Sequence, residues 1–117
     1  MSNMVTGNIK KVKIKMMPDR EKGSGQVVMQ GNLTLDSVDE VLHAFREAAQ
    51  KYTKIVVRAE RVMGIDLGFL QLLFALERAV KEKEGELTVR LDLEKDLEVL
   101  LRNTGFGRWL TQKSAKE

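Results

Sequence analysis

The sequence contains no cysteine and only one histidine and one proline among its 117 residues. Without cysteine, disulfides, thiolate metal sites and cysteine nucleophiles are excluded. The single histidine, His43, has no second histidine with which to form a metal pair, and it argues strongly against a Ser–His nucleophile site. We therefore expect a protein that is not an enzyme and that needs neither a metal nor another cofactor.

Aromatic residues make up only 5% of the chain, too few for an obvious base-stacking platform. The net charge of +3 is spread among 17 acidic residues, so we expect no nucleic-acid binding. No apolar run approaches the roughly 18 residues that a membrane span requires, and the lysine-rich N-terminus lacks the apolar centre of a secretory signal. The predicted location is the cytoplasm, with no membrane span.

Hydrophobic periodicity is present along most of the chain, and it alternates between strand and helix patterns. Two alternating stretches come first, and single strands and helices then follow one another. The predicted strands are 9–16, 26–30, 55–57 and 87–91, and the predicted helices are 38–52, 67 to about 83, and 94–102. This order predicts an α/β domain with a mixed β-sheet, mostly parallel but with an N-terminal antiparallel strand, covered by helices.

Several local features sharpen this prediction. Lysines alternate with apolar residues in the first strand, which is typical of an edge strand. Asp36 or Ser37 is expected to cap the first helix, and the apolar run 55–57 is typical of a strand covered on both faces. In the last helix we expect four leucines to point inward, namely Leu93, Leu97, Leu100 and Leu101. We expect residues 1–117 to form one domain, with a core of about 9–110 and flexible tails at 1–8 and 111–117.

The segment from Asp66 to Leu76 is the most unusual part of the sequence. One carboxylate precedes a helix in which Gln71 is the only clearly polar residue before Glu77. A helix that covers a sheet needs a single apolar stripe. Four apolar residues remain when that stripe is filled: Leu67, Phe69, Leu72 and Phe74. They are either buried between neighbouring elements or exposed as a patch typical of a protein-binding surface.

From about Gln26 to Leu110 the chain resembles a STAS domain, the fold of bacterial anti-sigma factor antagonists. Members typically show V-V-x-D-L-S, then x-V-x-x-I, then D-S-S-G-L before a leucine-rich helix. The corresponding stretches here are I-V-V-R-A-E from Ile55, R-V-M-G-I from Arg61 and D-L-G-F-L from Asp66. Gly31-Asn32-Leu33 also resembles the G-x-L of the family.

The resemblance implies that a kinase-type anti-sigma factor binds at the loop and helix of the D-S-S-G motif. In the family, phosphorylation of the first serine of that motif breaks the complex, because the phosphate adds charge to an apolar contact. In the ungapped register Leu67 replaces this serine, and no serine or threonine lies between Thr53 and Thr88. A rival register, shifted by one residue, would make Asp66 a permanent phosphate mimic.

We therefore predict a non-catalytic protein-interaction module that lacks the serine switch. Its partner is expected to be a regulatory protein, such as an anti-sigma factor or a histidine-kinase-like signalling protein. The same surface would also allow self-association. The predicted partner-binding residues are Gly31, Asn32, Asp66, Leu67, Gly68, Phe69, Gln71 and Leu72. The alternatives are a small STAS subunit of a transporter assembly and a domain that senses a nucleotide or another small ligand.

Overall fold

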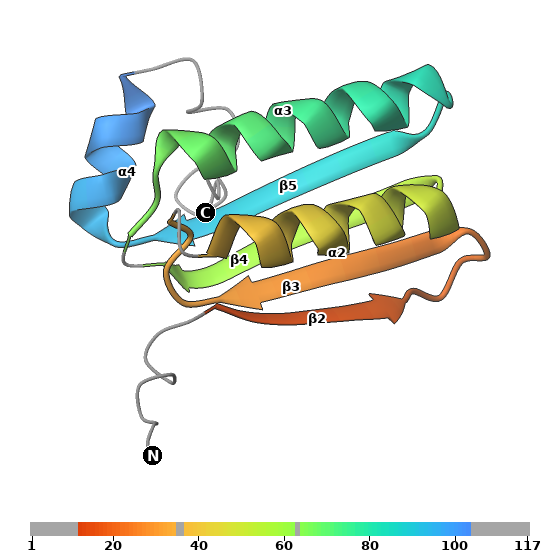
Figure 1. Cartoon of the computed structure of the whole chain (residues 1–117), viewed down its shortest axis with the longest axis horizontal. Helices are drawn as coiled ribbons and strands as arrows, with labels where there is room; N and C mark the ends of the chain where they lie inside the picture. The colour runs from red at the N-terminus through yellow and green to blue at the C-terminus, as the bar shows by residue number, and fades with distance from the viewer. Residues whose placement is uncertain (1–11, 35–36, 63, 104–117) are drawn as a thin grey trace, which may run out of the picture.

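The structure, a computed structural model, describes residues 12–34, 37–62 and 64–103. The predicted tails 1–8 and 111–117 lie outside these residues. The described part follows the predicted order of strands and helices (Figure 1). The elements are β2 (Lys13–Pro18), β3 (Ser24–Gln30), α2 (Val38–Lys51), β4 (Lys54–Val62), α3 (Leu67–Glu82), β5 (Glu86–Leu93) and α4 (Lys95–Arg102).

The four described strands form one mixed sheet in the order β2-β3-β4-β5. Strand β2 runs antiparallel to β3, whereas β3, β4 and β5 are mutually parallel. The predicted α/β fold with a mostly parallel sheet is thus confirmed. The alternating lysines Lys13 and Lys15 do lie on an edge strand, where charge discourages unwanted strand pairing.

Helices α2 and α3 cover the same face of the sheet and pack against each other (Figure 1). Burial therefore alternates along the strands: Ile55, Val57 and Ala59 are buried on β4, whereas Val56 is only half-buried and Arg58 is exposed. The prediction that 55–57 is covered on both faces was wrong. Three consecutive β-branched residues do not by themselves show whether a strand is buried on both faces of the sheet or on one face only.

The two covering helices begin differently. Ser37 precedes α2 as predicted, but its hydroxyl makes no capping hydrogen bond and instead donates to the carbonyl of Asn32 at 3.2 Å. The other predicted cap, Asp36, lies outside the described residues. Asp66 does cap α3, because its carboxylate accepts a hydrogen bond from the Phe69 N–H at 3.3 Å.

Helix α3 ends just before Gly85, as predicted, but the left-handed residue after the helix is Glu84, with φ of 62°, and not the glycine. The Gly85 N–H donates to the carbonyl of Val80, and a Cβ atom at this position would lie 2.1 Å from the carbonyl oxygen of Thr53. Only glycine allows the chain to pass this close to the loop before β4. Lys83 then ties the two helices together by donating to the carbonyls of Ala49 and Tyr52 at the end of α2.

Candidate functional site

Two loops that are far apart in the sequence meet at one end of the sheet. The Leu33 N–H donates to the carbonyl of Gly64 at 2.8 Å, and the Asp66 N–H donates to the carbonyl of Leu33 at 3.1 Å. These bonds form a parallel bridge between Leu33 and Ile65. The structure therefore brings together the two predicted binding segments, the one at Gly31 and Asn32 and the one that begins at Asp66.

The first of these loops is held by its backbone and by a buried hydroxyl. Gly31 has φ of 109°, in the left-handed region that favours glycine. Ser37 is buried, and its hydrogen bond to the Asn32 carbonyl closes the loop from the other side. The Asn32 side chain is exposed and passes over Gly64, so it lies beside the loop that leads to α3.

Asp66 has a structural role that the sequence left open. Its extended backbone and its hydrogen bond to the Phe69 N–H are those of a helix N-cap. A negative charge here also faces the positive end of the α3 dipole. The half-buried Asp66 is thus explained by helix capping alone, whatever else it contacts.

The predicted binding residues of α3 divide between surface and core. Leu67 is 58% exposed and Gln71 is also exposed, whereas Gly68 and Leu72 are half-buried. Phe69 is only 1% exposed. It lies at the third position of the helix and packs on Phe45 of α2, with ring centroids 6.3 Å apart. We therefore leave Phe69 out of the surface described below.

Three further apolar residues of α3 and α4 are exposed and were not among the predicted binding residues. Phe74 is 42% exposed on α3, and Val99 and Leu100 are 54% and 65% exposed on α4. The inward orientation predicted for Leu100 was wrong: α4 is a short helix at the end of the sheet, and Leu101 takes the buried position. Counting leucines cannot show which side of an eight-residue helix meets the core.

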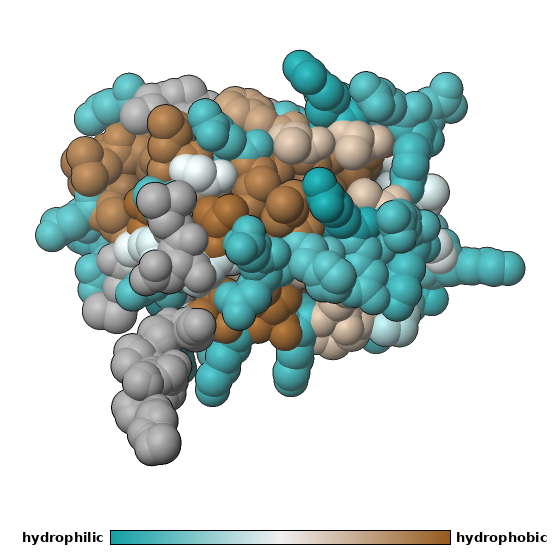
Figure 2. Space-filling model, viewed as in Figure 1, coloured by the Kyte–Doolittle hydropathy of each residue, from teal (hydrophilic) through white to brown (hydrophobic). Residues whose placement is uncertain are grey.

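In Figure 1, α4 lies beside the first turn of α3, where Leu67 is the first helical residue, and Phe74 lies two turns farther along α3. The two helices begin after the carboxyl ends of the neighbouring parallel strands β4 and β5, and the Glu94 N–H donates to the carbonyl of Val62. Figure 2 shows apolar surface gathered over the region where Figure 1 places α4 and the start of α3. We call Leu67, Phe74, Val99 and Leu100 the α3–α4 apolar surface.

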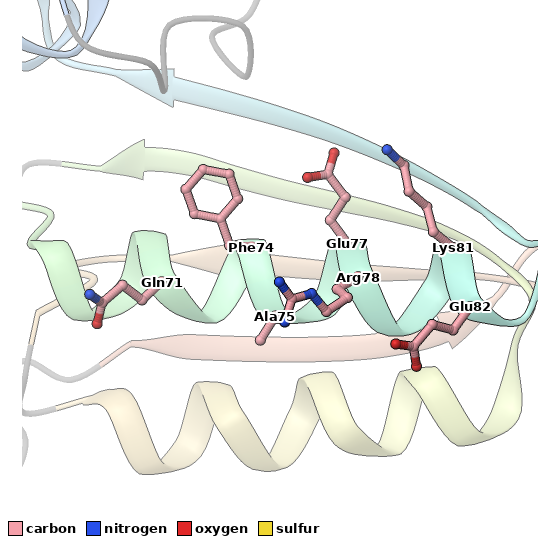
Figure 3. A pocket seen from close by; sticks show the side chains of 7 residues that line it. All are labelled: Gln71, Phe74, Ala75, Glu77, Arg78, Lys81 and Glu82. Carbon is pink, nitrogen blue, oxygen red and sulfur yellow. The ribbon is translucent and has the colours of Figure 1, made fainter.

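A shallow depression continues from this surface along the outer side of α3 (Figure 3). Phe74 and Ala75 contribute apolar area, and the more distant lining residues are charged. The described lining residues are Gln71, Phe74, Ala75, Glu77, Arg78, Lys81 and Glu82. A partner that contacts Leu67 and Phe74 would therefore meet charges of both signs farther along the helix.

Among the described residues, two features are not found: a cluster of metal ligands and a membrane-spanning helix. Within 12–34, 37–62 and 64–103, no group of three or more His, Asp or Glu side chains is placed to hold a metal ion. In the same part of the chain, no helix has the length and apolar character needed to cross a bilayer.

Comparison with known proteins places this arrangement in a family. No curated protein sequence matches the chain. Among the solved structures that match, two have 15% identity to this chain and show the same fold. One is the anti-sigma factor antagonist SpoIIAA in its unphosphorylated form, with a TM-score of 0.66 over 91% of this chain and 93% of that one. The other is the Bacillus cell fate determinant SpoIIAA in its phosphorylated form, with a TM-score of 0.61 over 91% and 96%.

A family model described as "Mlab, STAS domain" matches residues 16–112, which include every described helix and strand except the first half of β2. The match agrees with the mixed sheet, the two covering helices and the structural likeness to SpoIIAA. This chain therefore belongs to the STAS domain family.

Proposed function

We propose that this STAS domain is a non-catalytic interaction module that binds a regulatory protein through its α3–α4 apolar surface. The partner is an anti-sigma factor or a histidine-kinase-like signalling protein. The observation that carries the proposal is the exposure of Leu67 and Phe74 on a helix whose buried stripe is already filled by Phe69, Leu70, Leu73, Leu76 and Val80. Both side chains leave a large part of their apolar surface in water, and covering that surface with a partner is favourable.

The position of the surface supports a regulatory partner. It lies beside the Asp66 loop, which corresponds to the D-S-S-G segment that the family resemblance implies is the docking site. SpoIIAA, which has the same fold, is an anti-sigma factor antagonist. Gly68, Gln71 and the half-buried Leu72 follow Leu67 on α3, and Asn32 lies beside Gly64 in the preceding loop; these residues would form the margin of the contact.

The complex is proposed to lack control by serine phosphorylation. Leu67 is the first residue of α3 and, in the ungapped register, replaces the family's serine; the sequence has no serine or threonine from Lys54 to Leu87. A kinase-like partner would therefore find no hydroxyl in this region to phosphorylate. Adding ATP and Mg²⁺ to the assembled complex should not release the domain.

The test is co-purification of the tagged domain from its native cells, followed by identification of the bound protein. Recovery of an anti-sigma factor or a histidine-kinase-like protein by wild type, but not by Leu67→Asp, is the expected result. The matched control is Met17→Asp, which places the same charge on a 37% exposed apolar residue of β2. Equal recovery by Leu67→Asp and wild type would contradict the proposed surface.

The same apolar surface would also suit a permanent subunit interface, and the absence of a serine switch favours this second candidate. A small STAS subunit of a transporter assembly needs no regulated release. Co-purification with a transporter ATPase, in place of a regulator, would select this function. No comparable observation supports a role in sensing a nucleotide or another small ligand. A thermal shift on addition of nucleotides or lipids would be evidence for that role.

A further inference from the structure

A second groove lies between the edge strand β2 and helix α2. In Figure 1, β2 is at the opposite edge of the sheet from β5, and α4 lies at the end of β5. Figure 2 shows apolar surface along β2 beneath the polar surface of α2. The apolar residues of this β2–α2 groove are Val12, Ile14, Met16 and Ala44, and its polar residues are Asp39, Glu40, His43 and Glu47.

The backbone of β2 leaves a row of groups at the open edge. The Asp19 N–H donates to the carbonyl of Ser24 at 2.9 Å, which fixes the phase of the antiparallel ladder. Bonded and non-bonded pairs alternate along such a ladder, so Ile14 and Met16 direct their N–H and C=O groups away from β3. Pro18 is two residues after Met16, so its backbone groups also point away from β3. Its missing N–H therefore removes no hydrogen bond between β2 and β3. Among the described strands, β2 pairs only with β3.

The charges differ on the two sides of this edge. On the helix side, Asp39 and Glu40 form no ion pair with any described residue, and Glu47 pairs only with the exposed Lys51 of its own helix at 3.3 Å. No lysine or arginine of the described residues lines the groove. On the other side of β2, Lys13 and Lys15 are exposed.

We propose that the β2–α2 groove binds an extended, basic segment of a partner protein, which adds to the sheet as a strand along β2. Every second residue of that segment would face the groove, where lysine or arginine meets the carboxylates of α2 and an apolar residue covers Ile14 and Met16. The intervening residues would lie beside Lys13 and Lys15 and would be acidic or neutral. This site is separate from the α3–α4 apolar surface, so the domain could hold two proteins at once.

Charge argues against a second copy of this chain as the occupant. Two β2 strands paired around a two-fold axis would place Lys13 and Lys15 of both copies on the same sheet face. Like charges on neighbouring strands are destabilising. A partner segment with basic residues on the groove side avoids this repulsion and also neutralises the carboxylates of α2.

The test uses a synthetic peptide of about eight residues, the length of an ordinary strand. Its groove-facing positions carry lysine and leucine, and its other positions carry threonine and glutamate. We expect amide chemical shifts of β2 and α2 to change on titration with the full chain, whereas a peptide with lysine and glutamate exchanged should bind at least about fivefold more weakly. Equal affinity for the two peptides would overturn the proposal.

Protein variants locate the charges that are responsible. Glu40→Gln/Glu47→Gln should weaken binding of the basic peptide by about fivefold, because two surface charge contacts are lost. The matched control, Glu84→Gln/Glu86→Gln, removes two exposed carboxylates outside the groove and should leave the affinity unchanged. An equal loss in both variants would indicate only general attraction between opposite charges and would overturn the site.

Strand addition itself is tested by N-methylation of alternate peptide residues. Methyl groups on the residues that face β2 remove the donors of the new ladder and should abolish binding, whereas methyl groups on the other residues should not. Equal binding by both methylated peptides would overturn the strand arrangement. Dimerisation of the chain alone through β2, detected by sedimentation together with loss of peptide binding, would assign the edge to a second copy instead.

Discussion

Helices α2 and α3 lie side by side on one face of the sheet, but the residues that they expose to solvent differ in polarity. The exposed residues of α2 are all polar, whereas α3 exposes Leu67, Phe74 and Ala75. Both helices bury a continuous apolar stripe, so packing on the sheet cannot explain the difference. The comparison shows that α3, unlike α2, exposes apolar residues to solvent, and we propose that these residues bind a partner.

The largest predicted effect tests the buried side of α3. Phe69→Ala should lower the free energy of unfolding by about 3–5 kcal/mol, because Phe69 is enclosed in the core and packs on Phe45. Chemical denaturation gives this value directly. A loss below about 1 kcal/mol would mean that Phe69 is not the core residue that the structure shows.

A smaller effect is predicted where α3 begins. Asp66→Ala should cost about 1 kcal/mol of folding stability, because it removes the carboxylate that accepts from the Phe69 N–H. Asp66→Asn retains an N-cap acceptor and should restore most of this stability. If Asp66→Asn instead abolishes partner binding while the domain remains stable, the charge has a role in recognition as well as in capping.

The beginning of α2 offers a counterpart, because Ser37 does not cap its helix. Ser37→Ala should cost about 1 kcal/mol of folding stability, because the buried Ser37 hydroxyl loses its hydrogen bond to the Asn32 carbonyl. Amide hydrogen exchange should quicken mainly in the loop at Asn32 and Leu33. Faster exchange confined to the first turn of α2 would contradict the loop-closing role.

The smallest stability effects are predicted on the solvent side of α3. Leu67→Ala and Phe74→Ala should each change the free energy of unfolding by no more than about 0.5–1 kcal/mol, since both side chains are largely exposed. Denaturation under the conditions used for Phe69→Ala provides the comparison. A loss as large as that of Phe69→Ala would show that these residues serve the core.

Sequence periodicity predicted the fold well because burial is regular along long elements. The alternation in β2 and the repeated leucines of α3 each select one face, and the structure places the sheet and both covering helices accordingly. The STAS resemblance of the segment from Ile55 to Leu70 agrees with the family match.

The candidate site was less predictable, because exposure depends on which neighbours cover each residue. The sequence pattern placed both Phe69 and Phe74 outside the predicted apolar stripe of α3 and did not show which of them is exposed. In the structure Phe69 packs on Phe45 of α2 and is buried, whereas Phe74 remains 42% exposed. Similarly, only the packing of α4 at the end of the sheet shows that Leu100 faces solvent and Leu101 does not. The hydrogen bonds between Leu33 and the Asp66 loop are long-range contacts that no local pattern encodes.

The most direct test of the account is a calorimetric titration of the co-purified regulatory protein with wild type, Leu67→Asp/Phe74→Asp and the control Met17→Asp. The account predicts that the double variant binds about 100-fold more weakly, because the burial of two large apolar side chains is lost, while Met17→Asp binds as wild type does. Affinity for the double variant equal to that for wild type would contradict the assignment of the exposed side of α3 to partner binding.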